Sequence, residues 1–397
     1  MKKSLIALAV LAAAGTASAQ SSVTLFGIVD ATIQRVSNGG AGGGSVTRLH
    51  NSGESSSRLG FRGTEDLGGG MSASFWLEAG VNNDDGTGQT LSTNNQFAAT
   101  SAFASGGGEA GRNARAQNGT GLVFNRRSTV SLAGGFGEIR LGRDYTPQFW
   151  NLTVFDPYGT VGVGTNLMTS LNVSGPTSVR ASNTIGYFLP GNLGGFYGQI
   201  QHYRGENSST VANSGDGNGT AFRFGYAAGP VNVAIASGRT SYSLVTALAT
   251  ATSVTGGAQP AGSTRATNIA GSWNFGFMTL MAQASRDKAD ALAGVGGGSA
   301  KGKGYLLGAT APIGAGVLKF AASQYTTDYA GAGTDPRARK YALGYVHNLS
   351  KRTAVYTTIA RVQNNSTSAV SVFNGAAAAP ALGAHSTGYD LGIRHSF

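Results

Sequence analysis

The sequence contains no cysteine, so disulfides do not hold this fold together. Beyond residue 19 it has no apolar run close to the roughly 20 residues that a membrane-spanning helix needs. Charged residues make up only 12% of the chain, and acids are fewer than bases, 18 against 29. A disulfide-rich scaffold and a helical membrane protein are therefore not indicated.

The basic excess, a formal net charge of +11, is not gathered in a lysine-rich block or a basic helix. Arginines occur singly inside strand-like segments, which argues against nucleic acid as a partner. The 5 histidines are scattered without the spacing of metal ligands, so we expect no metal and no cofactor.

Residues 1–19 have the composition of a secretory signal peptide. Lys2 and Lys3 precede the apolar run from Leu5 to Ala14, and the segment from Ala17 to Ala19 supplies small residues for cleavage. We expect an exported protein whose single domain covers residues 20–397.

Glycine is abundant, with 63 residues, yet aromatic residues reach 9% of the chain and β-branched runs recur. This combination favours ordered strands joined by turns over disorder. Near residue 390, for example, Tyr389, Leu391 and Ile393 alternate with Asp390 and Arg394. A period of two is typical of a strand with one apolar and one polar face.

The strand-like segments are separated alternately by short and long connections. Seven short turns are expected at 65–70, 133–137, 190–195, 228–230, 274–276, 312–316 and 348–352. Eight long loops, rich in Gly, Ser, Asn and Thr, are expected near 37–54, 82–124, 145–178, 205–219, 241–263, 287–302, 326–338 and 364–385. Together they delimit sixteen strands in one all-β domain.

The alternation of loop lengths predicts a transmembrane, 16-stranded antiparallel β-barrel in an outer membrane. Such barrels have short periplasmic turns, long external loops and an even strand number, with both termini on the periplasmic side. Pairing the last strand with the first, near 23–30, removes both sheet edges. A soluble β-sandwich has no reason to place every long loop at one end.

Alternation also predicts which side chains face the lumen. Between Arg58 and Arg62, Leu59 and Phe61 take the lipid face, because an arginine there costs about 2–4 kcal/mol at mid-bilayer. Arg58 and Arg62 therefore point inward. The same parity within their own strands places Asp30 and Glu78 on the lumen side.

Several motifs resemble the general diffusion porins of Gram-negative outer membranes, and the betaproteobacterial branch is the most similar. These motifs are VTLFGIVD from Val23, SRLGFRGTEDLGGG from Ser57, GEIRLGRDYTP from Gly137 and GIRHSF from Gly392. The resemblance covers the whole mature chain. It implies a homotrimer of 16-stranded barrels in lipid and lipopolysaccharide, each with a third external loop folded inward to narrow the pore.

The resemblance also implies a constriction with basic residues on the wall and acids on the inward loop. The wall residues that match are Arg58, Arg126 and Arg180, with Arg143 and Arg62 as further candidates. The loop 145–178 carries one acid, Asp156. This imbalance predicts a water-filled, weakly anion-selective channel for passive diffusion of small hydrophilic solutes and inorganic ions.

Other interpretations remain open at this stage. Each arginine could be a solvated wall residue, and Asp156 could be an ordinary turn aspartate before Pro157. A channel preferring phosphate or organic acids would carry the same arginines. An outer-membrane hydrolase or an adhesin barrel is a further alternative, although no Gly-x-Ser-x-Gly motif or compact catalytic set suggests an enzyme.

Two further expectations rest on the resemblance alone. The terminal Phe397 resembles the mark by which the barrel-assembly machinery recognises outer-membrane barrels. The long second loop resembles a latch over a neighbouring barrel, although its glycines fit simple flexibility equally well.

Overall fold

Seven short turns and the strands that they join account for most of the architecture. The computed structural model describes residues 22–89, 95, 122–173, 175–209, 214–242, 262–290, 299–329, 333–373 and 377–397. The expected signal peptide and most of the expected second-loop latch lie outside these residues. Within the described residues, no helix is long and apolar enough to cross a membrane.

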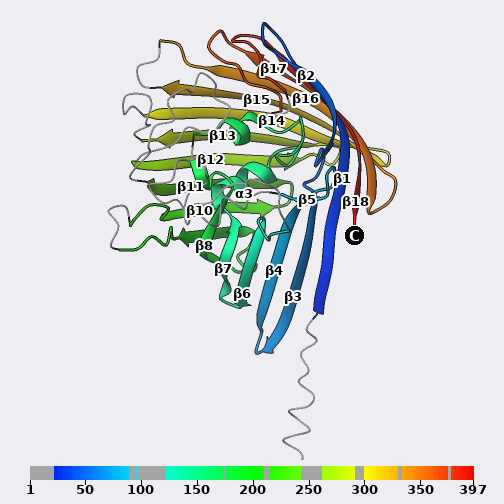
Figure 1. The fold of residues 1–397 in the computed structure, drawn as a ribbon. Helices are drawn as coiled ribbons and strands as arrows, with labels where there is room; N and C mark the ends of the chain where they lie inside the picture. The colour runs from blue at the N-terminus through cyan, green and yellow to red at the C-terminus, as the bar shows by residue number, and fades with distance from the viewer. Residues whose placement is uncertain are drawn as a thin grey trace, which may run out of the picture.

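The strands are named in chain order in Figure 1. Their bounds are β1 (Ser22–Asn38), β2 (Ser45–Asn51), β3 (Arg58–Gly68), β4 (Met71–Asn82), β5 (Thr87–Gly88), β6 (Arg127–Gly134), β7 (Gly137–Tyr145), β8 (Arg180–Phe188), β9 (Phe196–Tyr203), β10 (Gly219–Ala228), β11 (Val231–Tyr242), β12 (Gly262–Asn274), β13 (Thr279–Ala289), β14 (Ala300–Ile313), β15 (Gly316–Tyr329), β16 (Arg337–Asn348), β17 (Thr353–Asn364) and β18 (Ser386–Ser396).

The sheet closes on itself. In the described part of the chain, β2 and β5 extend external loops, and the other sixteen strands pair antiparallel around a ring. The ring closes where β1 pairs with β18, with Asp30 opposite Arg394. The expected 16-stranded antiparallel barrel is confirmed, and closure leaves no strand edge unpaired in the membrane.

The seven turns lie at one end of the barrel, where glycine supplies the backbone conformations that tight turns need. In the turn between β3 and β4, Gly68, Gly69 and Gly70 have φ angles of 77°, 60° and 76°. The long connections lie at the other end, so the predicted asymmetry of loop lengths is confirmed.

Alternation along the strands separates an apolar outer face from a polar lumen. In β1, Leu25 and Val29 are 54% and 43% exposed, whereas Asp30 is fully buried. In β16, exposed Tyr341 and Leu343 alternate with buried Lys340 and Ala342. The apolar side chains that a soluble protein would cover are therefore directed outward, as a lipid-facing wall requires.

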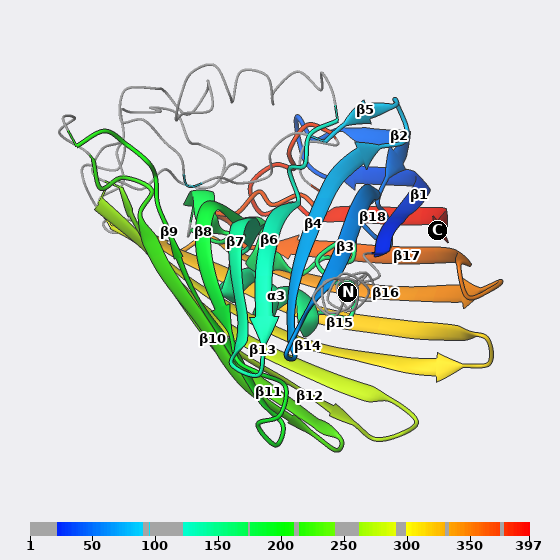
Figure 2. The same cartoon turned by 90° about the horizontal axis from the view of Figure 1, so that it is seen from below.

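The third long connection, residues 146–179 (loop three), folds into the barrel instead of covering its rim. It carries helices α3 (Pro147–Val154) and α4 (Leu167–Leu171) and the short 3-10 helix η2 (Gly175–Thr177). Pro147 fits the first turn of α3, and the Asn166 side chain caps α4 by accepting from Thr169 N at 2.9 Å. In Figure 2, α3 lies inside the ring of strands.

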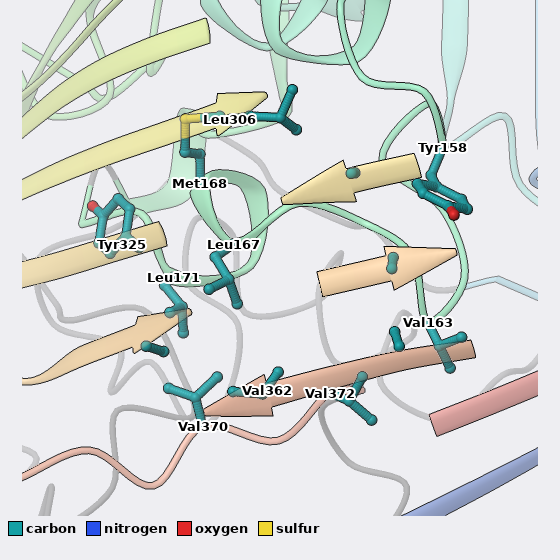
Figure 3. Packing of buried hydrophobic residues seen from close by; sticks show 14 of the residues in the cluster. Tyr158, Val163, Leu167, Met168, Leu171, Leu306, Tyr325, Val362, Val370 and Val372 are labelled. Carbon is teal, nitrogen blue, oxygen red and sulfur yellow. The ribbon is translucent and has the colours of Figure 1, made fainter. Parts of the chain in front are cut away.

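A hydrophobic core fills the lumen side next to β14–β17 and β1. Loop three contributes Val163, Leu167 and Met168, which pack with Val370 and Val372 of the last external connection, residues 365–385 (loop eight). Figure 3 shows these side chains meeting against the wall. A cavity remains on the opposite side, where β3, β4 and β6–β10 form the wall.

Candidate functional site

Glu78 on β4 lies at the centre of a cluster of charged side chains on the open side of the lumen. Arg126 Nε donates to Glu78 Oε1 at 2.5 Å, and an Arg58 guanidinium nitrogen lies 3.5 Å from the same oxygen. The Arg180 guanidinium lies 4.4 Å from the centre of the Tyr145 ring, and Arg126 also donates to the Tyr145 hydroxyl at 3.1 Å. The structure therefore brings Arg58, Arg126 and Arg180 together.

The two further candidates occupy different surroundings. Arg143 is 8% exposed, about as buried as Arg126 and Arg180, and donates to the Asn125 carbonyl at 2.6 Å and the Ser182 hydroxyl at 3.0 Å. Arg62 is exposed and lies over the rings of Phe26 and Trp76, at 5.4 and 5.2 Å, closer to the turn end of the barrel.

Asp156 lies inside loop three and not opposite the wall arginines. Its carboxylate accepts from Tyr158 N at 3.0 Å, Thr160 N at 3.2 Å and Asn166 Nδ2 at 2.6 Å, and the residue is only 5% exposed. Burial raises the pKa of Asp156 above its ordinary value, and these hydrogen bonds offset only part of the rise. The structure thus corrects the expectation of a loop acid facing the arginines, because amide donors within the loop bind this carboxylate.

A different acid reaches across the lumen, and no sequence pattern pointed to it. Glu54, between β2 and β3, forms an ion pair with Lys319 of β15. Asp30 holds this segment inward by accepting from the backbone N–H groups of Glu54 and Ser55 at 2.9 and 2.6 Å. Burial raises the pKa of Glu54 above its ordinary value, and the nearby Lys319 offsets only part of the rise. The partners are distant in sequence, so only the closed barrel brings them together.

The cluster opens into a cavity of about 520 Å³ between loop three and the wall. Its charged lining consists of five arginines and two carboxylates, an excess of three positive charges: Arg58, Arg126, Arg127, Arg140, Arg223, Glu78 and Asp144. Arg140 donates to Asp144 at 2.7 Å, and Arg127 Nε lies 3.7 Å from the same carboxylate. Sequence reasoning missed Arg127, Arg140 and Arg223, although strand parity was a usable signal for Arg140.

The cavity is lined by charged and aromatic side chains. Within the described residues, no group of three or more His, Asp or Glu side chains could hold a metal ion. His50 lies 3.9 Å from Asp84 on an external hairpin, away from the arginine cluster. A closed ring of sixteen strands with an apolar outer wall and a charged lumen defines a transmembrane β-barrel channel.

Comparison with known proteins identifies the family. The sequence model of the Gram-negative porins matches residues 5–367. Over the full length of both chains, the sequence is 40% identical to outer membrane porin protein 32 of Delftia acidovorans and 27% identical to an outer membrane porin protein of Bordetella pertussis.

A solved structure agrees with this assignment. An anion-selective porin from Comamonas acidovorans superposes with a TM-score of 0.75 at 34% identity, covering 95% of this chain and 100% of that one. This chain belongs to the Gram-negative porin family. It is an outer-membrane porin and a non-enzymatic channel, so the hydrolase alternative is wrong.

Proposed function

We propose that this porin admits small hydrophilic solutes by passive diffusion and favours anions over cations. The observation that carries the proposal is the excess of positive charge at the cavity beside loop three, where five arginines outnumber the lining acids Glu78 and Asp144 and the neighbouring Glu138 that pairs with Arg140. Fixed charges in a narrow passage bounded by protein raise the local concentration of counter-ions. The similar porin from Comamonas acidovorans is described as anion-selective, which supports the same preference here.

The constriction consists of Arg58, Arg126 and Arg180 around Glu78 and Tyr145. The Glu78 carboxylate holds Arg126 and Arg58, and the Tyr145 ring holds Arg180 by a cation–π contact. These contacts fix the guanidinium groups without neutralising all of them, since one carboxylate serves two arginines. Arg143 instead hydrogen-bonds to Asn125 and Ser182, and Arg62 lies closer to the turn end of the barrel.

The anion preference is tested by the zero-current potential of the purified protein in a planar bilayer under a KCl gradient. A unit charge about 4 Å from an ion contributes about 1 kcal/mol in bulk water. We therefore expect Arg126→Glu to lower the chloride-to-potassium permeability ratio several-fold. Lys351→Glu, the same charge reversal in a periplasmic turn, is the matched control. Potassium preference in the unaltered protein would contradict the proposal.

The working assembly proposed for this chain is a homotrimer surrounded by outer-membrane lipid and lipopolysaccharide. Residues 1–19 direct export of the chain as a signal peptide, and the barrel-assembly machinery then inserts it into the outer membrane. The trimer form reported for OmpT of Vibrio cholerae supports the oligomeric state. When one purified trimer inserts into a planar bilayer, we expect three equal steps in conductance, one for each open barrel.

A further inference from the structure

The cavity beside loop three is lined by aromatic rings as well as by arginines. Trp76, Phe188 and Tyr197 come from the wall strands β4, β8 and β9, and Trp150 comes from α3. The wall rings have arginines stacked on them and can hold these arginines in place, but selection of small inorganic anions needs no ring that is open to the passage. The Trp150 ring lines the cavity and is 39% exposed, so it offers an apolar face to a ligand.

Three arginines lie over the three wall rings. Arg127 lies 4.6 Å from the centre of the Trp76 ring, and Arg140 lies 3.9 Å from that of Phe188. The third pair joins Arg223 to Tyr197 at 4.7 Å. A guanidinium stacked on an aromatic ring is fixed in orientation and remains charged. The pairs form a stripe of planar cations along the wall strands β4–β10.

Trp150 of loop three lines the same cavity. Its side chain is 39% exposed, and its ring packs on Tyr145 with 5.5 Å between the ring centres. A ring entering the cavity would therefore meet both an exposed indole and stacked guanidinium groups. The cavity volume of about 520 Å³ lies in the range typical of small-molecule sites.

We propose that this cavity is a binding site for flat aromatic carboxylates. The ligand ring stacks between Trp150 and the guanidinium–aromatic stripe, and its carboxylate pairs with Arg58 or Arg127 on the wall. This inference rests on the proposed anion preference, because the carboxylate must enter a positively charged passage. Inorganic anions and aliphatic acids use the arginines but gain nothing from the rings, so the aromatic class is favoured over them.

The test compares benzoate with cyclohexanecarboxylate, which has the same charge and a similar size but no aromatic face. Each is added at increasing concentration to single channels of the purified protein in a fixed KCl solution. We expect benzoate to reduce the KCl current at a several-fold lower concentration than cyclohexanecarboxylate. Equal effects of the two acids, or no effect of either, would overturn the proposal.

Variants of tryptophan locate the effect. Trp150→Ala should remove most of the difference between the two acids, and Trp150→Phe should restore part of it. Trp273→Ala is the matched control, because Trp273 of β12 is 48% exposed on the outer wall. If benzoate still reduces the KCl current of Trp150→Ala at a lower concentration than cyclohexanecarboxylate does, the proposed site is wrong. The zero-current potential of the same channels in a KCl gradient measures the anion preference separately. Failure of the proposed binding site can therefore be told apart from failure of the proposed anion preference.

Discussion

At the residue scale, buried aspartates hold the inward segments of this barrel in place. Asp30 of β1 accepts from the backbone of residues 53–55, and Asp390 of β18 accepts from Val163 N of loop three at 2.9 Å. Asp156 does the same within loop three. A carboxylate accepts several N–H donors at once, which suits it to fix irregular backbone inside a lumen.

This arrangement predicts the effect of Asp156→Asn. The amide keeps one acceptor oxygen and presents two N–H donors, so donors from Thr160 and Asn166 lose their acceptor. Losing such charge-assisted hydrogen bonds costs about 1.5–3 kcal/mol each. We expect noisier open-channel currents and faster cleavage within loop three by added thermolysin. Asp66→Asn, in an exposed periplasmic turn, removes the same charge as a control, and identical behaviour of the two variants would contradict the assignment.

At the element scale, loop three and loop eight form an apolar core inside the barrel, whereas the charged cavity occupies the other side of the lumen. The wall behind them is built from small residues, such as Ala338 and Ala342 of β16. A side chain at Gly304 of β14 would clash with Met168 of α4. Lys340 donates to the Val372 carbonyl at 3.0 Å and so ties loop eight to the wall. The two loops and the wall therefore stabilise one another as a unit.

Truncating this core should loosen the constriction loop. Leu167 of α4 is 1% exposed, and a buried Leu→Ala change costs about 2–5 kcal/mol. We expect Leu167→Ala to give a higher and more variable single-channel conductance, because the loop that narrows the passage loses its anchor. Leu193→Ala, in a periplasmic turn where the side chain is 39% exposed, should leave conductance unchanged. Unaltered conductance in Leu167→Ala would show that the core does not set the width of the passage.

The strands could be predicted from the sequence, whereas the contacts of the loops could not. A lipid-facing wall imposes alternation and short turns on the sequence itself, so local pattern identifies sixteen strands. The core between Leu167 and Val372 joins apolar residues of two loops far apart in the chain, and nothing local marks them as partners. The resemblance to porins predicted Asp156 as an acid facing the arginines, whereas the donors to its carboxylate lie within its own loop.

At the scale of the whole molecule, the seam between β1 and β18 decides whether the sheet becomes a barrel. Phe397 N donates to the Gly27 carbonyl at 3.1 Å, and Gly27 N donates to the Phe397 carbonyl at 3.1 Å. The Phe397 ring covers Gly27 so closely that a Cβ there would clash with it. The terminal aromatic residue therefore packs over the seam, where its side chain is 43% exposed.

This contact predicts that deleting Phe397 impairs insertion and leaves the selectivity of assembled channels unchanged. The deletion removes two hydrogen bonds of the seam and the ring over Gly27, while the arginines around Glu78 lie on the lumen side of other strands. Heat-modifiable mobility of outer-membrane fractions on gels measures the folded yield, and the KCl zero-current potential measures selectivity. Phe397→Tyr keeps ring and backbone and should assemble nearly as well as the unaltered protein. Normal folded yield after the deletion would show that closure depends on the strand ladder alone.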